Sequence, residues 1–346
     1  MTNKTVYWHA DSHDPALASI RLRMLLPMEA LRELGYDVRP LTGALPADAS
    51  LVIFSKSLSA DALVIAEQAA ARGQPIVYDI CDNVFEKPSR NDQDEARKQR
   101  VRRMMELAKI VTIGTQPLAD LLAREVPAIA AKTEIIADAL EGSRPLLASA
   151  SLMDRARLWL LRRFLRRNAD ALRLIWFGKC KKGYAGIEHL DPVVRLLETL
   201  PLPRPVTLTV VSNRRKIYRR SASKWQVPKF YLPWSLATFD TALRLHDVAI
   251  IPVDRNDYTV GKSINRPATA LMAGLGVIAD PIPAYEELAP FIYLGDWERG
   301  LIEYAGADPR KDRRIGGAQS YLRQRYGAAA IAECWADIID RALAKA

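Results

Sequence analysis

"DVAIIPVDRNDYTVGKSINRPATALMAGLGVIAD", residues Asp247–Asp280, contains the pattern that decides the fold. A short apolar run leads into a polar, cationic loop, then into a segment with helical periodicity, and after a glycine into a second apolar run. Short apolar strands joined through helices are typical of α/β proteins with parallel sheets. The stretch therefore predicts one strand–helix–strand unit, with the helix over residues 265–272.

The same alternation extends in both directions from this stretch and occurs twice. Before residue 142 we expect strands at 4–10, 36–41, 50–56, 75–81, 110–115 and 133–139, and after it at 172–179, 206–213, 247–253 and 276–280. Amphipathic helices separate them, and the first is expected over 19–35. The chain is predicted to form two Rossmann-like doubly wound α/β domains that face a cleft. The predicted parts are an acceptor-binding domain at 1–142, a basic linker helix at 143–172 and a nucleotide-sugar-binding domain at 173–325. A C-terminal helix at 326–346 is expected to cross back to the N-terminal domain.

Composition narrows the class of protein. The 346 residues carry a formal net charge of +10, with 49% hydrophobic residues and three widely spaced cysteines. This pattern favours a reduced, cytoplasmic protein without a signal peptide or membrane span, and it excludes a disulfide framework or zinc knuckle. The positive charge indicates an anionic partner. No nucleic-acid-binding motif accompanies it, so we expect a phosphorylated ligand or an acidic membrane surface.

Phosphate-binding features lie at the predicted strand ends of the second half. A glycine at a strand end admits backbone N–H groups to a phosphate, and the N-terminus of a helix favours anions. Lysine and arginine beside such groups supply the opposite charge. The expected donor site comprises Gly178, Lys179, Lys182, Ser212, Asn213, Lys262, Ser263, Asn265, Arg266 and Thr269.

The order of these motifs resembles the GT-B glycosyltransferases of the large retaining family 4 type. "DVAIIPV", "GKSINRPATALMAGLGVIAD", "IVYDICDN" and "VTIGTQPLADLL" are similar to the family's segments, and the resemblance runs from Tyr7 to about Leu294. It implies a metal-independent, hexosyltransferase-like enzyme without a cofactor, whose co-substrate is a nucleotide sugar. It also implies catalysis by cationic stabilisation of the leaving diphosphate, here by Lys262 and Arg266. The implied acceptor is a glycan or lipid-linked molecule in bacterial surface polysaccharide or glycoconjugate synthesis.

The chain departs from the family pattern where an acid pair is expected. Thr269 stands where the family has a glutamate for the donor ribose, and Gly261 stands where it has the partner acid. Arg266 replaces a lysine and Gly276 a proline. Threonine cannot bridge a diol as a carboxylate does. Three consequences remain open: a different donor such as a CMP-linked acidic sugar, compensation elsewhere, or a catalytically silent nucleotide-sugar-binding or assembly protein.

The first half offers acceptor and base candidates in "WHADSHD" and after later strands. His9 and Asp11 are candidate catalytic bases for an inverting reaction. The alternative is that they are solvated loop residues without a catalytic role. Their spacing does not predict a metal site. The expected acceptor residues are His13, Arg21, Arg23, Asp79 and Asp82. Simple exposure of the arginines, and capping or turn formation by the aspartates, are the alternatives.

Arginine-rich segments add a third feature. Residues 153–168 combine leucines, Trp159 and Phe164 with six arginines, which is typical of a helix lying on an anionic membrane surface. Such a helix would place the protein peripherally on the inner face of the cytoplasmic membrane; a plain interdomain or dimer helix is the alternative. The second segment, 212–225, is expected to be a basic loop near the donor, or a solvated charge run.

Overall fold

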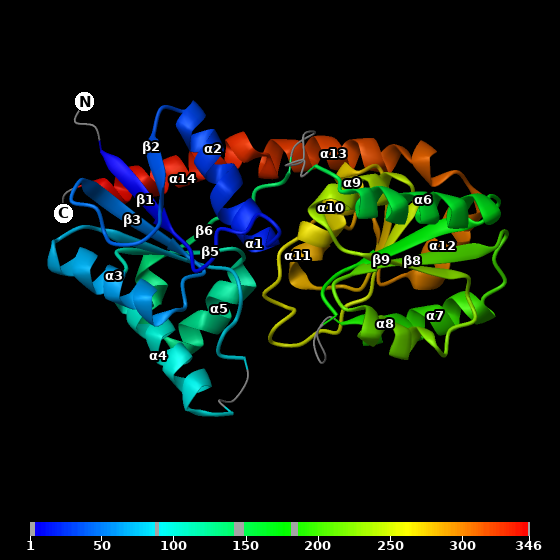
Figure 1. Ribbon diagram of the computed structural model, residues 1–346, viewed down its shortest axis with the longest axis horizontal. Helices are drawn as coiled ribbons and strands as arrows, with labels where there is room; N and C mark the ends of the chain where they lie inside the picture. Colours follow the sequence, from blue (N-terminus) through cyan, green and yellow to red (C-terminus); the bar gives the residue numbers. More distant parts are fainter. Residues whose placement is uncertain (1–3, 87–89, 142–148, 181–185, 345–346) are drawn as a thin grey trace. The chain divides into compact units, whose positions relative to one another are not determined.

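The computed structural model describes residues 4–86, 90–141, 149–180 and 186–344 (Figure 1). Their contacts divide the chain into two compact units. The first comprises Met1–Gly142, Val260–Ser263 and Gln324–Ala346, and the second comprises Ser143–Thr259 and Ile264–Arg323. The short loop Val260–Ser263 thus belongs by its contacts to the first unit, although the predicted second domain ran without interruption over 173–325.

The first unit is built on a parallel six-stranded sheet in the order β2-β1-β3-β4-β5-β6. Its strands are β1 (Thr5–His9), β2 (Asp37–Leu41), β3 (Ala49–Ser55), β4 (Ile76–Ile80), β5 (Ile110–Ile113) and β6 (Thr133–Ile135). The central strands are buried on both faces and read as continuous apolar runs, as in β4, IVYDI. That pattern is expected where helices cover both faces of a parallel sheet.

Helices cover the two faces of this sheet as separate apolar layers. α3 (Ala60–Ala71), α4 (Asp92–Leu107) and α5 (Gln116–Glu125) pack on one face. The other is covered by α1 (Ala18–Ile20), the π-helical turn η1 (Arg21–Leu25), α2 (Leu26–Glu33) and the C-terminal α14 (Ala328–Leu343). Tilted stacking of Trp8 on Trp335, with ring centroids 4.7 Å apart, holds α14 on β1. A short 3-10 helix, η2 (Pro127–Lys132), leads into β6.

The second unit repeats the architecture with a parallel sheet in the order β12-β11-β10-β7-β8-β9. Its strands are β7 (Leu172–Phe177), β8 (Val206–Ser212), β9 (Lys229–Pro233), β10 (Val248–Ile251), β11 (Gly276–Ala279) and β12 (Tyr293–Leu294). One face packs on η3 (Ile187–His189), α7 (Leu190–Thr199), α8 (Arg215–Ala222) and α12 (Trp297–Gly306). Figure 1 shows α6 (Leu152–Arg167), α9 (Leu236–Arg244), α10 (Asn265–Met272) and α13 (Arg313–Tyr326) over the other face. Two short helical segments complete the unit, α11 (Pro283–Glu286) and η4 (Pro309–Lys311).

The predicted fold class is confirmed, since both halves are doubly wound parallel α/β sheets. Three local expectations differ. The helix expected over 19–35 contains the π-helical turn η1, and the expected basic loop at 212–225 contains helix α8. β9, KFYLP, was not predicted, because a lysine and a proline interrupt its apolar pattern. Proline is tolerated there since β9 is an edge strand.

Candidate functional site

The two sheets each have a point where the strand order reverses. In the first sheet β2 lies on one side of β1 and β3 on the other; in the second β8 lies on one side of β7 and β10 on the other. In open α/β sheets, ligands bind outside the carboxyl ends of the strands at such reversal points. The side chains at these two edges are therefore the candidate functional residues.

Beneath the carboxyl edge of the first sheet lies a buried ionic network centred on Arg23. Its guanidinium bonds both Asp79 oxygens through Nε, at 3.0 and 3.1 Å, and Asp138 through Nη1 at 2.8 Å. Arg23 and Asp79 are 2% and 1% exposed. Although burial works to lower it, the carboxylates of Asp79 and Asp138 hold the pKa of Arg23 well above its ordinary value.

Neighbouring strands complete the network around Asp79. Ser55 at the end of β3 donates to one carboxylate oxygen at 2.8 Å, and Thr112 of β5 donates to the other at 2.9 Å. The Trp8 indole donates in turn to Ser55. An acceptor could reach Arg23 or Asp79 only by displacing these partners, so the expectation that these two residues contact an acceptor is corrected. They position Asp138, which accepts a hydrogen bond from Ser263 at 2.7 Å.

A second cluster at this edge joins three charged side chains that are partly open to solvent. Lys56 and Lys262 both form ion pairs with the carboxylate of Asp82, and their side chains are 35% and 30% exposed. Burial acts to raise the pKa of Asp82, but the two ammonium groups hold it far below its ordinary value. Lys56 has a left-handed backbone, with φ of 50°, which is unusual for a residue other than glycine. Such strain often occurs at functional sites, and Lys56 was not predicted from the sequence.

His9 lies at the end of β1, where the first sheet reverses. Its Nδ1 is 2.7 Å from the hydroxyl of Ser57, which follows β3. Burial lowers its pKa, with Asp11 opposing the shift, and this favours the neutral imidazole. A neutral imidazole can accept a proton, as the predicted role of a base requires.

Two other predicted residues of this region, Asp11 and Arg21, have structural partners. The carboxylate of Asp11 accepts hydrogen bonds from the backbone N–H groups of Leu58 and Ser59, at 2.7 and 3.1 Å, and therefore anchors the start of α3. Arg21 is 4% exposed and forms an ion pair with Glu141, so the expected acceptor contact of Arg21 is corrected to a structural one. His13 is half-buried, and its Nε2 has no hydrogen-bond partner among the described residues.

The reversal point of the second sheet is occupied by Arg266, Gly178 and Trp176. The Arg266 guanidinium carbon lies 5.8 Å from the centroid of the Trp176 ring. A Cβ at Gly178 would lie 2.7 Å from Nη2 of Arg266, so the guanidinium fits against the strand end only because residue 178 has no side chain. The fold thus brings together the end of β7 and the start of α10, which are separated by almost ninety residues.

The neighbouring strand β8 ends in a different environment. Ser212 is fully buried, and its hydroxyl lies 2.8 Å from Sγ of Cys180. This burial corrects the expectation that Ser212 contacts a ligand. Asn213 is exposed and accepts a hydrogen bond from the Cys180 backbone at 3.2 Å, which ties the ends of β7 and β8 together.

The remaining donor candidates lie at the same edge or outside the described residues. Lys179 follows Gly178 directly, and Lys182 falls in the segment 181–185, outside the described residues. Asn265 and Thr269 are half-buried on α10, and Ile264 occupies the N-cap position of that helix without a side-chain cap.

Two glycines, Gly261 and Gly276, fit their surroundings closely. A Cβ at Gly261 would lie 3.1 Å from Cδ1 of Leu118, and the Gly261 carbonyl accepts a hydrogen bond from Thr115 at 3.1 Å. A Cβ at Gly276 would lie 2.5–2.7 Å from the ring and hydroxyl of Tyr304. A larger residue at either position would require its neighbour to move.

Two hollows lie within the units. One, of about 420 Å³, follows the carboxyl ends of β10 and β11 and falls in the size range of ligand pockets. It is lined by Glu188, His189, Pro192, Val193, Leu196, Pro252, Val253, Asp254, Asp280 and Trp297. These residues were not predicted from the sequence, although "PVD" directly after β10 could have indicated Asp254. Both carboxylate oxygens of Asp280 are bonded, by Val253 N–H and by the Trp297 indole.

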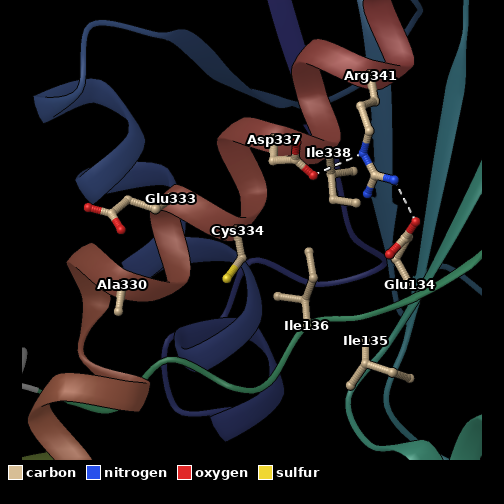
Figure 2. Close-up of a pocket in the computed structure, with 9 residues that line it drawn as sticks. All are labelled: Glu134, Ile135, Ile136, Ala330, Glu333, Cys334, Asp337, Ile338 and Arg341. Atoms are coloured by element: carbon tan, nitrogen blue, oxygen red, sulfur yellow. Dashed lines mark hydrogen bonds and ion pairs between the residues drawn. The ribbon is translucent and has the colours of Figure 1, made fainter.

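The other hollow, of about 370 Å³, lies between β6 and α14 of the first unit (Figure 2). Arg341 bridges Glu134 and Asp337 across it, at 2.6 and 2.9 Å, and Cys334 lines it. It contains none of the predicted site residues, so it does not mark the chemistry expected from the sequence.

The described residues hold neither a cluster suited to a metal ion nor a helix able to span a membrane. They contain no group of three or more histidine, cysteine, aspartate or glutamate side chains placed to hold a metal ion. None of their helices combines the length and the apolar composition needed to cross a bilayer. All three cysteines of the chain are free thiols.

No protein-family model matches this chain, and no curated protein sequence does. Solved structures similar in fold do exist. An α,α-trehalose-phosphate synthase (UDP-forming) from Burkholderia vietnamiensis aligns with 96% of this chain and 96% of its own, with a TM-score of 0.60 and 10% identity. AviGT4, a glycosyltransferase involved in avilamycin A biosynthesis, aligns over 99% of both chains, with a TM-score of 0.58 and 12% identity. A trehalose-6-phosphate protein from E. coli bound with UDP-2-fluoro glucose covers 93% of this chain and 77% of its own, with a TM-score of 0.58 and 12% identity. At these identities the likeness establishes a shared fold.

Proposed function

We propose that this chain is a glycosyltransferase that moves a sugar from a nucleotide-sugar donor to a glycan or lipid-linked acceptor. The observation that carries the proposal is Arg266, held at the reversal point of the second sheet against Gly178 and Trp176. A guanidinium beside a side-chain-free strand end, at the start of a helix, suits the diphosphate of a nucleotide sugar. Structures of the same fold include a UDP-forming synthase and a complex with UDP-2-fluoro glucose, which agrees with such a donor.

Catalysis in this proposal rests on stabilising the charge that develops on the departing diphosphate. Arg266 supplies a planar, permanently charged group that can bond two phosphate oxygens at once. Lys262 precedes the same helix in sequence and supplies a second cation. Positive groups fixed before the reaction begins are worth more than mobile ones, because no reorganisation is needed as charge develops.

The first unit supplies the acceptor side in this proposal. Lys56 and Asp82 form an ion pair at its carboxyl edge, and His9 lies at the same edge with a depressed pKa. In an inverting reaction, neutral His9 would take the proton of the attacking hydroxyl. In a retaining reaction the leaving phosphate would take that proton, and His9 would orient the acceptor instead.

The proposed setting is bacterial surface polysaccharide or other glycoconjugate synthesis on the cytoplasmic side of the membrane, with a hexose donor and no metal ion. Three free thiols agree with a reducing compartment. Among the predicted donor residues, Arg266 and Lys262 already provide the cationic charge that a metal ion supplies to other phosphate sites.

A nucleotide screen followed by turnover tests the proposal. UDP-, GDP-, ADP-, dTDP- and CMP-sugars are added one at a time, and the melting temperature and the release of free nucleotide are measured. One donor class should raise the melting temperature and be turned over. Lys262→Ala combined with Arg266→Ala should abolish both effects, because the diphosphate loses both cations. Arg195→Ala is the matched control, since Arg195 is an exposed arginine of α7 in the same unit as Arg266.

Each outcome of the screen has a defined reading. Stabilisation without turnover, across a panel of acceptors, would replace the enzyme with a catalytically silent nucleotide-sugar-binding protein. Strongest stabilisation by a CMP-sugar would identify an acidic-sugar donor and account for Thr269 in place of a carboxylate. If no nucleotide shifts the melting temperature, the proposal is wrong.

A further inference from the structure

Exposed large apolar side chains are concentrated on one helix. Among the described residues eight large hydrophobic side chains are strongly exposed, and four of them lie on α6. They are Leu152, Met153, Trp159 and Leu160, at 83%, 60%, 51% and 47% exposure. Single exposed hydrophobic residues are common on protein surfaces, but a cluster of them indicates an interaction site.

The helix has a separate face for its own unit. Leu158, Leu161 and Leu165 are buried, and Phe164 stacks on Phe230 of β9 with ring centroids 5.5 Å apart. A capping box formed by Ser151 and Asp154 fixes the start of α6. The helix is thus anchored by one face, and Figure 1 shows it alongside α9 on the second sheet.

The opposite face combines the exposed apolar residues with arginines. At about 100° per residue, Leu152, Trp159 and Leu160 fall on the side away from the buried leucines, together with Arg163 and Arg167. The Arg163 guanidinium carbon lies 5.5 Å from the centroid of the Trp159 ring. Further exposed arginines flank this face, at positions 155, 162 and 166. The whole helix carries six arginines and one aspartate.

We propose that the outward face of α6 docks on an anionic lipid bilayer, with Leu152, Met153, Trp159 and Leu160 in the headgroup boundary and the arginines on lipid phosphates. Apolar residues interleaved with cations on one helix face are what an anionic leaflet binds. Charge selects this occupant over a second copy of the chain, because two copies would bring Arg163 and Arg167 against their own counterparts. A nucleic acid would engage the arginines but would leave the four apolar side chains in water.

Vesicle flotation of the full chain tests the proposal. The protein is mixed with vesicles of phosphatidylcholine alone or of phosphatidylcholine with phosphatidylglycerol. It should bind only the anionic vesicles, and binding should weaken as salt is added. Arg163→Gln with Arg167→Gln should reduce binding about 30-fold, at roughly fivefold per lost charge. Trp159→Ser with Leu160→Ser should reduce it by about tenfold or more, through lost apolar burial.

A matched control separates docking from general effects on the surface. Arg195→Gln with Ile302→Ser removes one exposed cation and one exposed apolar side chain elsewhere in the same unit, and it should leave vesicle binding unchanged. Unchanged melting temperatures for all variants would show that they are folded. Equal binding to neutral and anionic vesicles, or no binding to either, would overturn the proposal. So would a dimer in sedimentation velocity that the Trp159/Leu160 variant dissociates, because the face would then belong to a second copy. Nucleotide binding is measured in parallel, so failure at the membrane and failure of the proposed donor site remain distinguishable.

Discussion

The carboxyl edges of the two sheets share a topology but differ in the side chains that occupy them. In the first unit the edge is underlain by a saturated ionic network, in which Arg23 and Asp79 are almost completely buried and hydrogen-bonded. In the second unit the strand at the reversal point ends in Gly178, whose missing side chain leaves room for the Arg266 guanidinium. The first edge has its charges compensated internally, whereas the second places a cation at the ligand-binding position of the fold.

This difference shows how one architecture can serve two purposes. A buried ion pair costs desolvation and gives a fixed geometry, so it suits a surface that must present residues such as Ser263 in one place. A glycine at a strand end gives up side-chain packing and allows a close approach, so it suits a phosphate site. Substitutions at the first edge should therefore affect stability, and substitutions at the second edge should affect ligand binding.

The largest stability effect is expected from Asp79→Ala, which leaves Arg23 buried with only Asp138 as a charged partner. Breaking a buried pair on one side costs about 3–5 kcal/mol of unfolding free energy. Urea unfolding measures it. Glu67→Ala is the control, since it removes a half-exposed ion pair with Arg103 in the same unit and should cost less than about 1 kcal/mol. Equal costs for the two variants would contradict the assigned role of the network.

As the pH falls, the second unit should lose folding stability at a higher pH than the first. His246 is buried between Ala242 and Thr209, and burial lowers its pKa to about 4 from 6.5. Because the unfolded state binds the proton first, stability is full above pH 6.5 and falls as the pH drops toward 4, by about 3 kcal/mol in all. In the first unit, the depressed pKa of Asp82 stabilises the fold, and this contribution is lost only when the pH falls below 3.8, the pKa of Asp82 in the unfolded chain.

Hydrogen exchange followed from pH 7 to 4 checks this order, since it reports on each unit separately. His246→Gln should flatten the loss in the second unit, because the amide can hydrogen-bond but does not titrate. His9→Gln is the counterpart in the first unit, where a smaller effect is expected since His9 is only partly buried. Loss of protection in the first unit at higher pH than in the second would reverse the predicted order.

At the second edge, Gly178→Ala should weaken nucleotide binding about tenfold, or about 1.4 kcal/mol, with little change in stability. The new methyl group would meet the end of the Arg266 side chain, which can shift but then leaves its position beside Trp176. Titration calorimetry with the nucleotide identified by the screen measures the change. Gly316→Ala on α13 adds a methyl group in open space and should leave binding as it is.

The smallest effect concerns the strained backbone at Lys56. Glycine normally destabilises relative to alanine, but at φ of 50° the left-handed conformation favours glycine. Lys56→Gly should therefore be more stable than Lys56→Ala by about 1 kcal/mol, since both lose the pair with Asp82 and only alanine keeps the strain. Urea unfolding of the two variants measures it, and alanine being the more stable would contradict the strain.

The sequence predicted the alternation of strands and helices because apolar periodicity is local. It did not predict the Arg23–Asp79 pair, whose partners are 56 residues apart and come together only in the folded sheet. The amphipathic pattern of α6 could be predicted because it too depends only on neighbouring residues. β9 could not, because its lysine and proline interrupt the apolar pattern of a strand. Lys56 could not be predicted, since lysine has no preference for the left-handed backbone conformation that it adopts here. Ser212 shows the reverse error, because a polar residue at a strand end was buried by its contact with Cys180.

The central claim is that Arg266 holds the phosphates of a nucleotide at the second edge. Calorimetric titration of the wild-type chain and of Arg266→Ala, each with the nucleoside diphosphate and with the corresponding nucleoside, tests it most directly. The wild type should bind the diphosphate at least about tenfold more tightly than the nucleoside, since a charge-assisted pair contributes more than 1 kcal/mol. That preference should be largely lost in Arg266→Ala, with nucleoside binding unchanged. An equal preference for the diphosphate in both proteins would contradict the claim.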